Sequence, residues 1–210
     1  MKEPVPVTTN PWVTRRPASL PTPPPSQPPL CPLTGPGAPQ PGIDQPARGA
    51  LPIATRPERP VLWVLGAHGG SGESLLSSLQ EGWMAAGHSW PAGSSAPVVL
   101  AARTGFEGLT RAQAVLTQWA SGAVGDPRLL GLILLADAPG RRPRALRDLG
   151  RIVGGGAPRV WEVPWVEAWR LGQGLAHDRL PRQARRMIDD LSSLVSDRTP
   201  PPPPHRGVRP

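Results

Sequence analysis

The chain has 210 residues, of which 32 are proline, and its formal net charge at pH 7 is +8. So much proline excludes a single packed domain over the whole length, and 18 of the prolines precede Val61. The charge divides into +3 for residues 1–60 (6 basic, 3 acidic), +3 for 61–199 (15 basic, 12 acidic) and +2 beyond. This even spread disfavours a nucleic-acid-binding face, so nucleic acid is not an expected partner.

Several classes of site and location are excluded by the same inspection. Cys31 is the single cysteine, so we expect neither a disulfide nor a thiolate metal site, and the four histidines have no metal-ligand spacing. No catalytic nucleophile with a matching base is evident. The longest apolar run, "LLGLILLA", is too short to span a membrane, and the N-terminal residues do not resemble a signal peptide. We therefore expect a cytoplasmic protein without a membrane span.

The chain divides into three parts by composition. Residues 1–60 alternate proline with small and polar residues, which predicts a disordered, polyproline-like leader. Residues 61–197 are predicted to form one folded domain, and residues 198–210 a disordered tail rich in Pro and Arg. Within the leader, Trp12 stands in "NPWVTRR" and is a candidate anchor for a protein partner, although a plain linker would also contain such a residue.

Apolar runs alternate with amphipathic stretches from Val61 onward, and this order predicts an α/β domain with a mostly parallel sheet of about four strands. Strands are predicted at 61–66, 96–103, 129–137 and 159–165, and helices at 73–87, 109–122, 143–156 and 182–196. The run 129–137 is apolar on both sides, which is typical of an interior parallel strand.

The stretch "GAHGGSGES", residues 66–74, stands where the first strand gives way to the first helix. Gly69, Gly70, Ser71 and Gly72 can direct backbone N–H groups inward as an anion cradle, and the helix start adds its partial positive charge. The stretch departs from the GxxxxGK(S/T) phosphate-binding pattern, because Ala67 replaces the first glycine and Glu73 replaces the lysine. Ser74 still occupies the position of the Mg²⁺-binding hydroxyl.

Glu73 opposes phosphate binding at this loop. Two like charges about 4 Å apart cost roughly 4 kcal/mol at an effective dielectric constant near 20. The glutamate also has a structural explanation, since a carboxylate in the first turn of a helix interacts favourably with the helix dipole. The sequence therefore assigns no cofactor, and ATP with Mg²⁺ is a candidate that Glu73 argues against.

The loop resembles that of the ParA and MinD-type ATPases, GKGGxGK(S/T), with His68 and Glu73 at the positions of the two lysines. The following strand, helix and strand are similar to the later half of those proteins. On that alignment Asp137 takes the place of an asparagine near the base, and "VWEVPWVEAW" resembles the segment with the family's "iP" turn. Only 22 residues separate Leu75 from Val98, so the family's second strand and magnesium-side aspartate are not expected. The resemblance implies a P-loop-like three-layer sandwich that has lost hydrolysis.

A second alignment makes "LLGLILLADAP" the magnesium-binding strand, with Asp137 in a DxP motif, although the spacing from helix to strand favours the first. Under either alignment Asp137 lies at the carboxyl edge of the sheet, where open parallel sheets bind ligands. Arg103, Arg141 and Arg142 are expected at the same edge. Such an arginine would either replace the missing lysine or pair with Glu73, and we favour the pairing.

With "NPWV" in its proline-rich leader and "PRVWEVPWVEAWRLG" near the end of its domain, the chain also resembles an uncharacterised actinobacterial family, related to these ATPases, that is often found near plasmid or conjugative-element genes. We therefore expect a non-hydrolysing scaffold or partner-binding protein linked to the maintenance of such elements. The alternatives are an ATPase in which an arginine replaces the lysine, and a DNA-associated segregation factor. Three tryptophans at a spacing of four, Trp161, Trp165 and Trp169, are expected to pack in the core rather than to form a partner surface.

Trp12 provides a first test of partner binding. Pull-downs from the native host with the wild type and with Trp12→Ala should differ in at least one recovered protein, because the substitution removes the apolar anchor from the leader. Identical sets of recovered proteins would make "NPWVTRR" an ordinary linker.

Overall fold

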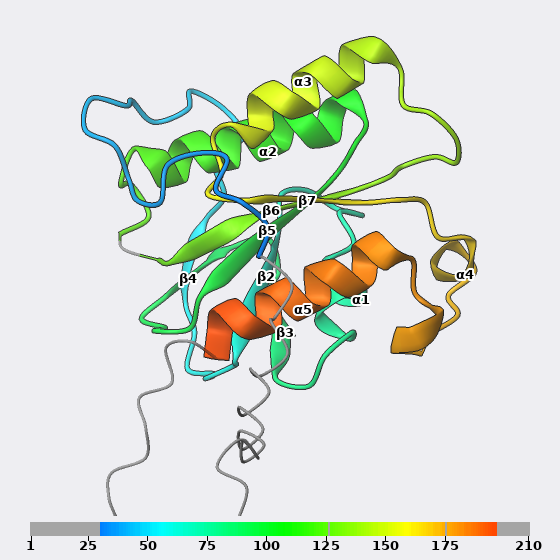
Figure 1. Cartoon of the computed structure of the whole chain (residues 1–210). Helices are drawn as coiled ribbons and strands as arrows, with labels where there is room; N and C mark the ends of the chain where they lie inside the picture. Colours follow the sequence, from blue (N-terminus) through cyan, green and yellow to red (C-terminus); the bar gives the residue numbers. More distant parts are fainter. Residues whose placement is uncertain (1–29, 126, 175, 197–210) are drawn as a thin grey trace, which may run out of the picture.

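The computed structural model describes residues 30–125, 127–174 and 176–196 (Figure 1). The proposed Trp12 anchor and the predicted tail 198–210 lie outside these residues. No helix in the described part of the chain is long and apolar enough to cross a membrane.

A five-stranded parallel sheet forms the centre of the domain, in the order β3-β2-β5-β6-β7. The strands are β2 (Leu62–Gly66), β3 (Trp83–Ala85), β5 (Val98–Arg103), β6 (Leu129–Leu135) and β7 (Val160–Val163). The chain is thus an α/β protein with a mostly parallel sheet, as predicted, but the expected number of about four strands is too low. All seven residues of β6 are buried, and β6 lies between β5 and β7, which confirms the interior position predicted from its composition.

Helices cover both faces of this sheet (Figure 1). Along β2, Trp63 and Leu65 join the apolar cluster of α2 and α3, whereas Leu62 and Val64 join that of α1 and α5. This alternation follows from the two-residue period of a strand, and it explains why the strands of the interior are apolar throughout. The helices are α1 (Glu73–Ser77), α2 (Phe106–Ala120), α3 (Arg144–Gly154), α4 (Glu167–Arg170) and α5 (Arg182–Ser196), with a 3₁₀ turn, η1, at His177–Arg179.

The helix predicted over 73–87 is wrong beyond its first turns. α1 ends at Ser77, and Gly82 has a φ of 79°, a left-handed conformation that a helix interior does not contain. Trp83 then starts β3, pairs with Leu62 and is buried beside α5. A helical spacing of apolar residues therefore misled the prediction, because burial of Trp83 at the sheet edge outweighed the local pattern.

Residues 30–60 differ from the expected disordered leader, since they lie along the domain. Their strand β1 (Ile53–Thr55) pairs with β4 (Trp90–Ala92) in a second, two-stranded parallel sheet. The Cys31 N–H donates to Asp190 Oδ2 at 3.1 Å, and the Thr34 N–H donates to the Pro158 carbonyl at 2.9 Å. Backbone groups between the prolines thus find partners on the domain, which composition alone does not reveal.

The three tryptophans Trp161, Trp165 and Trp169 do not lie on one helix. Trp161 lies in β7 and is buried, with its indole N–H donating to Asp190 Oδ2 at 2.9 Å, so core packing is confirmed for this residue. Trp169 lies in α4 and packs against the apolar cluster of α1 and α5, to which Trp161 belongs. Trp165 is half-buried between them, and its indole N–H donates to Glu167 Oε2 at 2.7 Å.

Gln118 connects α2 to residues 30–60, and its removal should destabilise the fold. Its buried amide accepts from the Leu51 N–H and the Trp90 indole N–H and donates to the Leu51 carbonyl, at 2.8 to 3.0 Å. Gln118→Ala leaves these groups unpaired and should lower the free energy of unfolding by about 2–4 kcal/mol in urea titrations. Gln113→Ala, at an exposed position of the same helix, should change it by less than about 0.5 kcal/mol. Equal effects would contradict a stabilising role for this connection.

Candidate functional site

The loop between β2 and α1 passes over the carboxyl end of β2. Gly70 and Gly72 have φ of 76° and 93°, and the Ser71 N–H closes a tight turn by donating to the His68 carbonyl at 3.1 Å. A Cβ on Gly66 would lie 2.5 Å from Ser71 Oγ and 2.7 Å from the His88 ring, so only glycine fits there. A hollow of about 260 Å³ opens above the loop.

Six of the eight predicted site residues line this hollow. They are Gly70, Ser71, Gly72, Glu73, Ser74 and Arg103, and they are joined by Leu75 and by His88, which the sequence did not indicate. Gly69 and Asp137 do not line it. The structure thus brings these six residues together, whereas Asp137 belongs to a neighbouring cleft; their role in cofactor binding stays a prediction.

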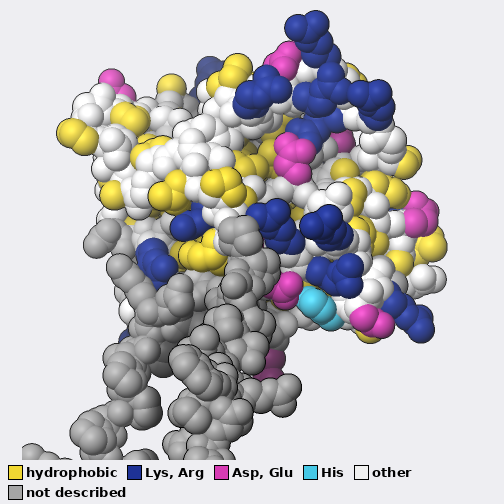
Figure 2. All heavy atoms as spheres, in the orientation of Figure 1, with side chains coloured by type: hydrophobic (Ala, Val, Ile, Leu, Met, Phe, Trp, Pro, Cys, Tyr) yellow, Lys and Arg dark blue, Asp and Glu magenta, His cyan; other side chains and the backbone are white. Residues whose placement is uncertain are grey.

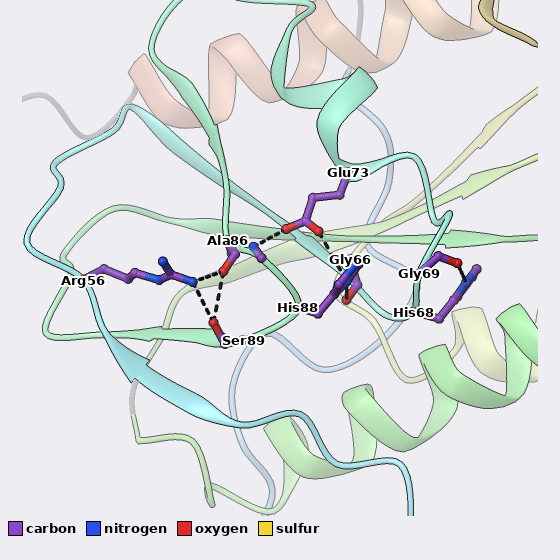
Figure 3. Close-up of polar contacts among 9 residues, drawn as sticks. Arg56, Gly66, His68, Gly69, Glu73, Ala86, His88 and Ser89 are labelled. Carbon is purple, nitrogen blue, oxygen red and sulfur yellow. Dashed lines mark hydrogen bonds and ion pairs between the residues drawn. The ribbon is translucent and has the colours of Figure 1, made fainter.

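Glu73 points away from the tip of the loop and toward the turn between β3 and β4 (Figure 3). Its side chain is 6% exposed, Oε1 accepts from the Gly87 N–H at 2.6 Å, and Oε2 lies 3.3 Å from His88 Nδ1. Among the described residues Glu73 forms no ion pair with an arginine, so the expected pairing is wrong. Instead the carboxylate holds a turn, and its negative charge remains at the side of the hollow.

His88 reinforces the same junction. Its Nδ1 lies 3.0 Å from the Gly66 carbonyl as well as near Glu73 Oε2, and because both neighbours are acceptors, Nδ1 carries the hydrogen. His88 has a φ of 54°, a left-handed conformation that is uncommon for residues other than glycine. His88 thus links the end of β2, the start of α1 and the turn at residues 86–89.

Arg56 approaches this turn from the opposite side (Figure 3). Its guanidinium donates to the Ala86 carbonyl and, at 2.8 Å, to Ser89 Oγ. The turn at residues 86–89 is therefore held by a carboxylate from α1 and by a cation from residues 30–60. No motif in the sequence indicated this arrangement, because its members are separated by up to 33 residues and Gly87 resembled the end of a helix.

Arg103, the candidate substitute for the lysine, ties the loop to the sheet. Nε donates to the Gly70 carbonyl at 3.1 Å and Nη1 to the Ala136 carbonyl at 2.9 Å. Its backbone N–H donates to Nε2 of His68, whose Nδ1 lies 2.8 Å from the Gly69 carbonyl, so His68 carries its hydrogen on Nδ1. Burial lowers the pKa of the Arg103 guanidinium, although the nearby Asp137 opposes this.

Asp137 follows β6 and belongs to a cleft of about 850 Å³ between the β6–α3 loop and the end of β7. Its Oδ1 accepts from the Thr104 hydroxyl at 2.7 Å, and its N–H donates back to that hydroxyl at 3.2 Å. Arg141 and Arg142 line the same cleft, so their expected position at the carboxyl edge is confirmed. In the described ranges, no group of three or more His, Cys, Asp or Glu side chains could hold a metal ion.

Comparison with known proteins places the chain in a family. The model of a family of unknown function, DUF6668, matches residues 60–188. The chain belongs to DUF6668. No curated protein and no solved structure matches it significantly. In this DUF6668 protein the matched residues include the loop, the turn at residues 86–89 and the cleft, whereas Arg56 and β1 precede them.

The role of Glu73 in holding the turn can be separated experimentally from its interaction with the helix dipole. Glu107 provides the comparison, because it also lies in the first turn of a helix but is exposed. Glu73→Ala removes the acceptor of the Gly87 N–H and the partner of His88, and should lower the free energy of unfolding by about 2–3 kcal/mol. Glu107→Ala removes only a dipole interaction and should cost less than about 1 kcal/mol. Chemical denaturation of both variants provides the measurement, and similar losses would show that the dipole alone accounts for Glu73.

Proposed function

We propose that the chain is a non-hydrolysing, ParA/MinD-like scaffold that binds a protein partner. In this proposal the domain is a degenerate P-loop-like three-layer sandwich. Its support is the glycine-rich loop between β2 and α1, the left-handed conformation of Gly70 and Gly72, and the helices on both sheet faces. The link to plasmid or conjugative-element maintenance belongs to the same proposal, and the cytoplasmic location stays a prediction.

The observation that carries the proposal is that the residue at the lysine position and the arginine that could replace the lysine are both bonded within the fold. Glu73, at the lysine position, is buried and bonded to the Gly87 N–H and His88. Arg103 donates hydrogen bonds from Nε and Nη1 to the carbonyls of Gly70 and Ala136. The resembled ATPases need a cation that reaches the β- and γ-phosphates, and neither side chain supplies one in this arrangement.

The charge of the hollow supports the same conclusion. Glu73 contributes a carboxylate that is shielded from water, and such a charge repels a triphosphate more strongly than an exposed one. A loop of this shape can therefore be kept as a tight connection between strand and helix. Its glycines then serve the close approach of Gly66 to Ser71 and His88.

One observation favours the alternative, an ATPase in which Arg103 replaces the lysine. Arg103 lines the hollow together with Ser74, which is exposed and stands at the Mg²⁺-binding position of the resembled family. Ligand binding would then require Arg103 to exchange a carbonyl partner for phosphate oxygens, a replacement that arginine geometry allows.

Nucleotide titration separates the two functions. With the full chain, calorimetry against ATP and ADP at millimolar concentrations with Mg²⁺ should give no saturable heat, and phosphate release should equal the buffer blank. Turnover or saturable binding by the wild type would contradict the proposal. If that turnover or binding is lost in Arg103→Gln but kept in the exposed control Arg111→Gln, the arginine-substituted ATPase is the correct function.

A further inference from the structure

The cleft beside Asp137 differs in chemistry from the hollow over the loop. It lies between the loop that follows β6, the start of α3 and the segment after β7, and its volume is about 850 Å³. Figure 2 shows arginine side chains gathered over α3 and the loop before it, with a further group along α5. Five of these arginines lie within residues 141–151, so the positive charge is already local in the sequence, and the fold places part of it at the cleft.

Two arginines of the cleft have no carboxylate partner in the part of the chain that the structure describes. Arg141 and Arg147 both line it and are exposed, and neither forms an ion pair within the described residues. Arg142 differs, because its Nη2 lies 2.8 Å from Glu162 Oε2 and its Nη1 is buried against Gly150. Two cations are therefore available to an incoming anion.

The carboxylates nearby are bonded to other groups. Asp148 lies on α3 but is shared by Arg144 and Arg151, at 3.6 and 3.1 Å. Asp137 is engaged with Thr104, and Glu162 with Arg142. The charged residues that line the cleft are three arginines, Arg141, Arg142 and Arg147, and two carboxylates, Asp137 and Glu162. A ligand in this cleft meets a net positive rim.

The cleft also has an apolar side. Trp165, Pro164 and Leu146 line it, and the indole N–H of Trp165 is already bonded to Glu167. The ring is therefore available for apolar contact without an unpaired donor. Tryptophan and arginine are both enriched among the residues that contribute most to the binding energy of protein interfaces.

We propose that this cleft docks an acidic peptide segment of the partner protein, with carboxylates on Arg141 and Arg147 and an apolar side chain against Trp165. The inference rests on the proposed partner-binding function and names the chemistry of the partner. Arginine and carboxylate match in geometry, since two parallel N–H donors meet two oxygens.

A nucleic acid fits the cleft less well. The phosphates of a backbone are regularly spaced and need an extended basic stripe, whereas this site is concave and contains Asp137 and Glu162 among its arginines. A peptide can place its carboxylates beside the arginines alone and direct other side chains toward Trp165.

Selection from a phage library of random 12-residue peptides, on the immobilised full chain, provides the test. Peptides enriched by the wild type should be rich in Asp and Glu with at least one large apolar residue. In fluorescence anisotropy the best of them should bind Arg141→Glu/Arg147→Glu at least tenfold more weakly. The control Arg48→Glu/Arg111→Glu changes the charge equally at exposed arginines of another hollow and should bind within twofold of the wild type.

Every outcome decides between the occupants. No enrichment, enrichment of neutral peptides, or equal losses in the two double variants overturns the inference. Tighter binding of a 12-nucleotide single-stranded DNA, lost in Arg141→Glu/Arg147→Glu, overturns it in favour of nucleic acid. A failure of peptide binding does not affect the proposed absence of hydrolysis, because phosphate release is measured separately. Turnover of ATP by the wild type would overturn the proposed function whatever the cleft binds.

Discussion

The burial of one parallel sheet on both faces is the constraint on which the rest of the structure depends. The residues of β2 are all buried, as are those of β6, and they send successive side chains into two separate apolar clusters. Parallel strands of this composition are stable only when helices cover both faces. The crossovers that place those helices also bring all strand ends to a common edge. The loop after β2, Arg103 and Asp137 meet there for that reason.

At this edge the fold uses charged side chains as internal connections. Glu73 joins α1 to the turn at residues 86–89, Arg56 holds the same turn from residues 30–60, and Arg103 joins the loop to β6. Each is bonded to backbone or side-chain groups of the fold, and such bonds offset the cost of placing a charge away from water. Side chains committed in this way are poorly suited to binding and releasing a phosphate. The proposed loss of hydrolysis follows from that commitment.

The neighbouring cleft shows the opposite use of charge. Arg141 and Arg147 lie at a concave surface, next to Trp165, without a carboxylate partner in the described part of the chain. Leaving two like charges close together disfavours the isolated protein slightly and favours association with an anionic partner. Within one sheet edge, therefore, one set of charges is committed to the structure and another is available for binding.

The sequence by itself determined the α/β class, the strands β2, β5, β6 and β7, and the helices α2, α3 and α5, because long apolar periods report burial directly. It also placed the glycine-rich loop and the arginines at the carboxyl edge, since parallel topology alone puts them there. The brief strand β3, the packing of residues 30–60 and the partners of Glu73 and Arg103 were decided only by the tertiary structure. Each depends on groups distant in sequence: Trp83 is buried against α5, Gln118 holds Leu51, and Glu73 meets the Gly87 N–H. A local sequence pattern does not specify which distant donor or apolar surface a residue will contact. At this site those long-range contacts decide whether a charged side chain stabilises the fold or is available to a ligand.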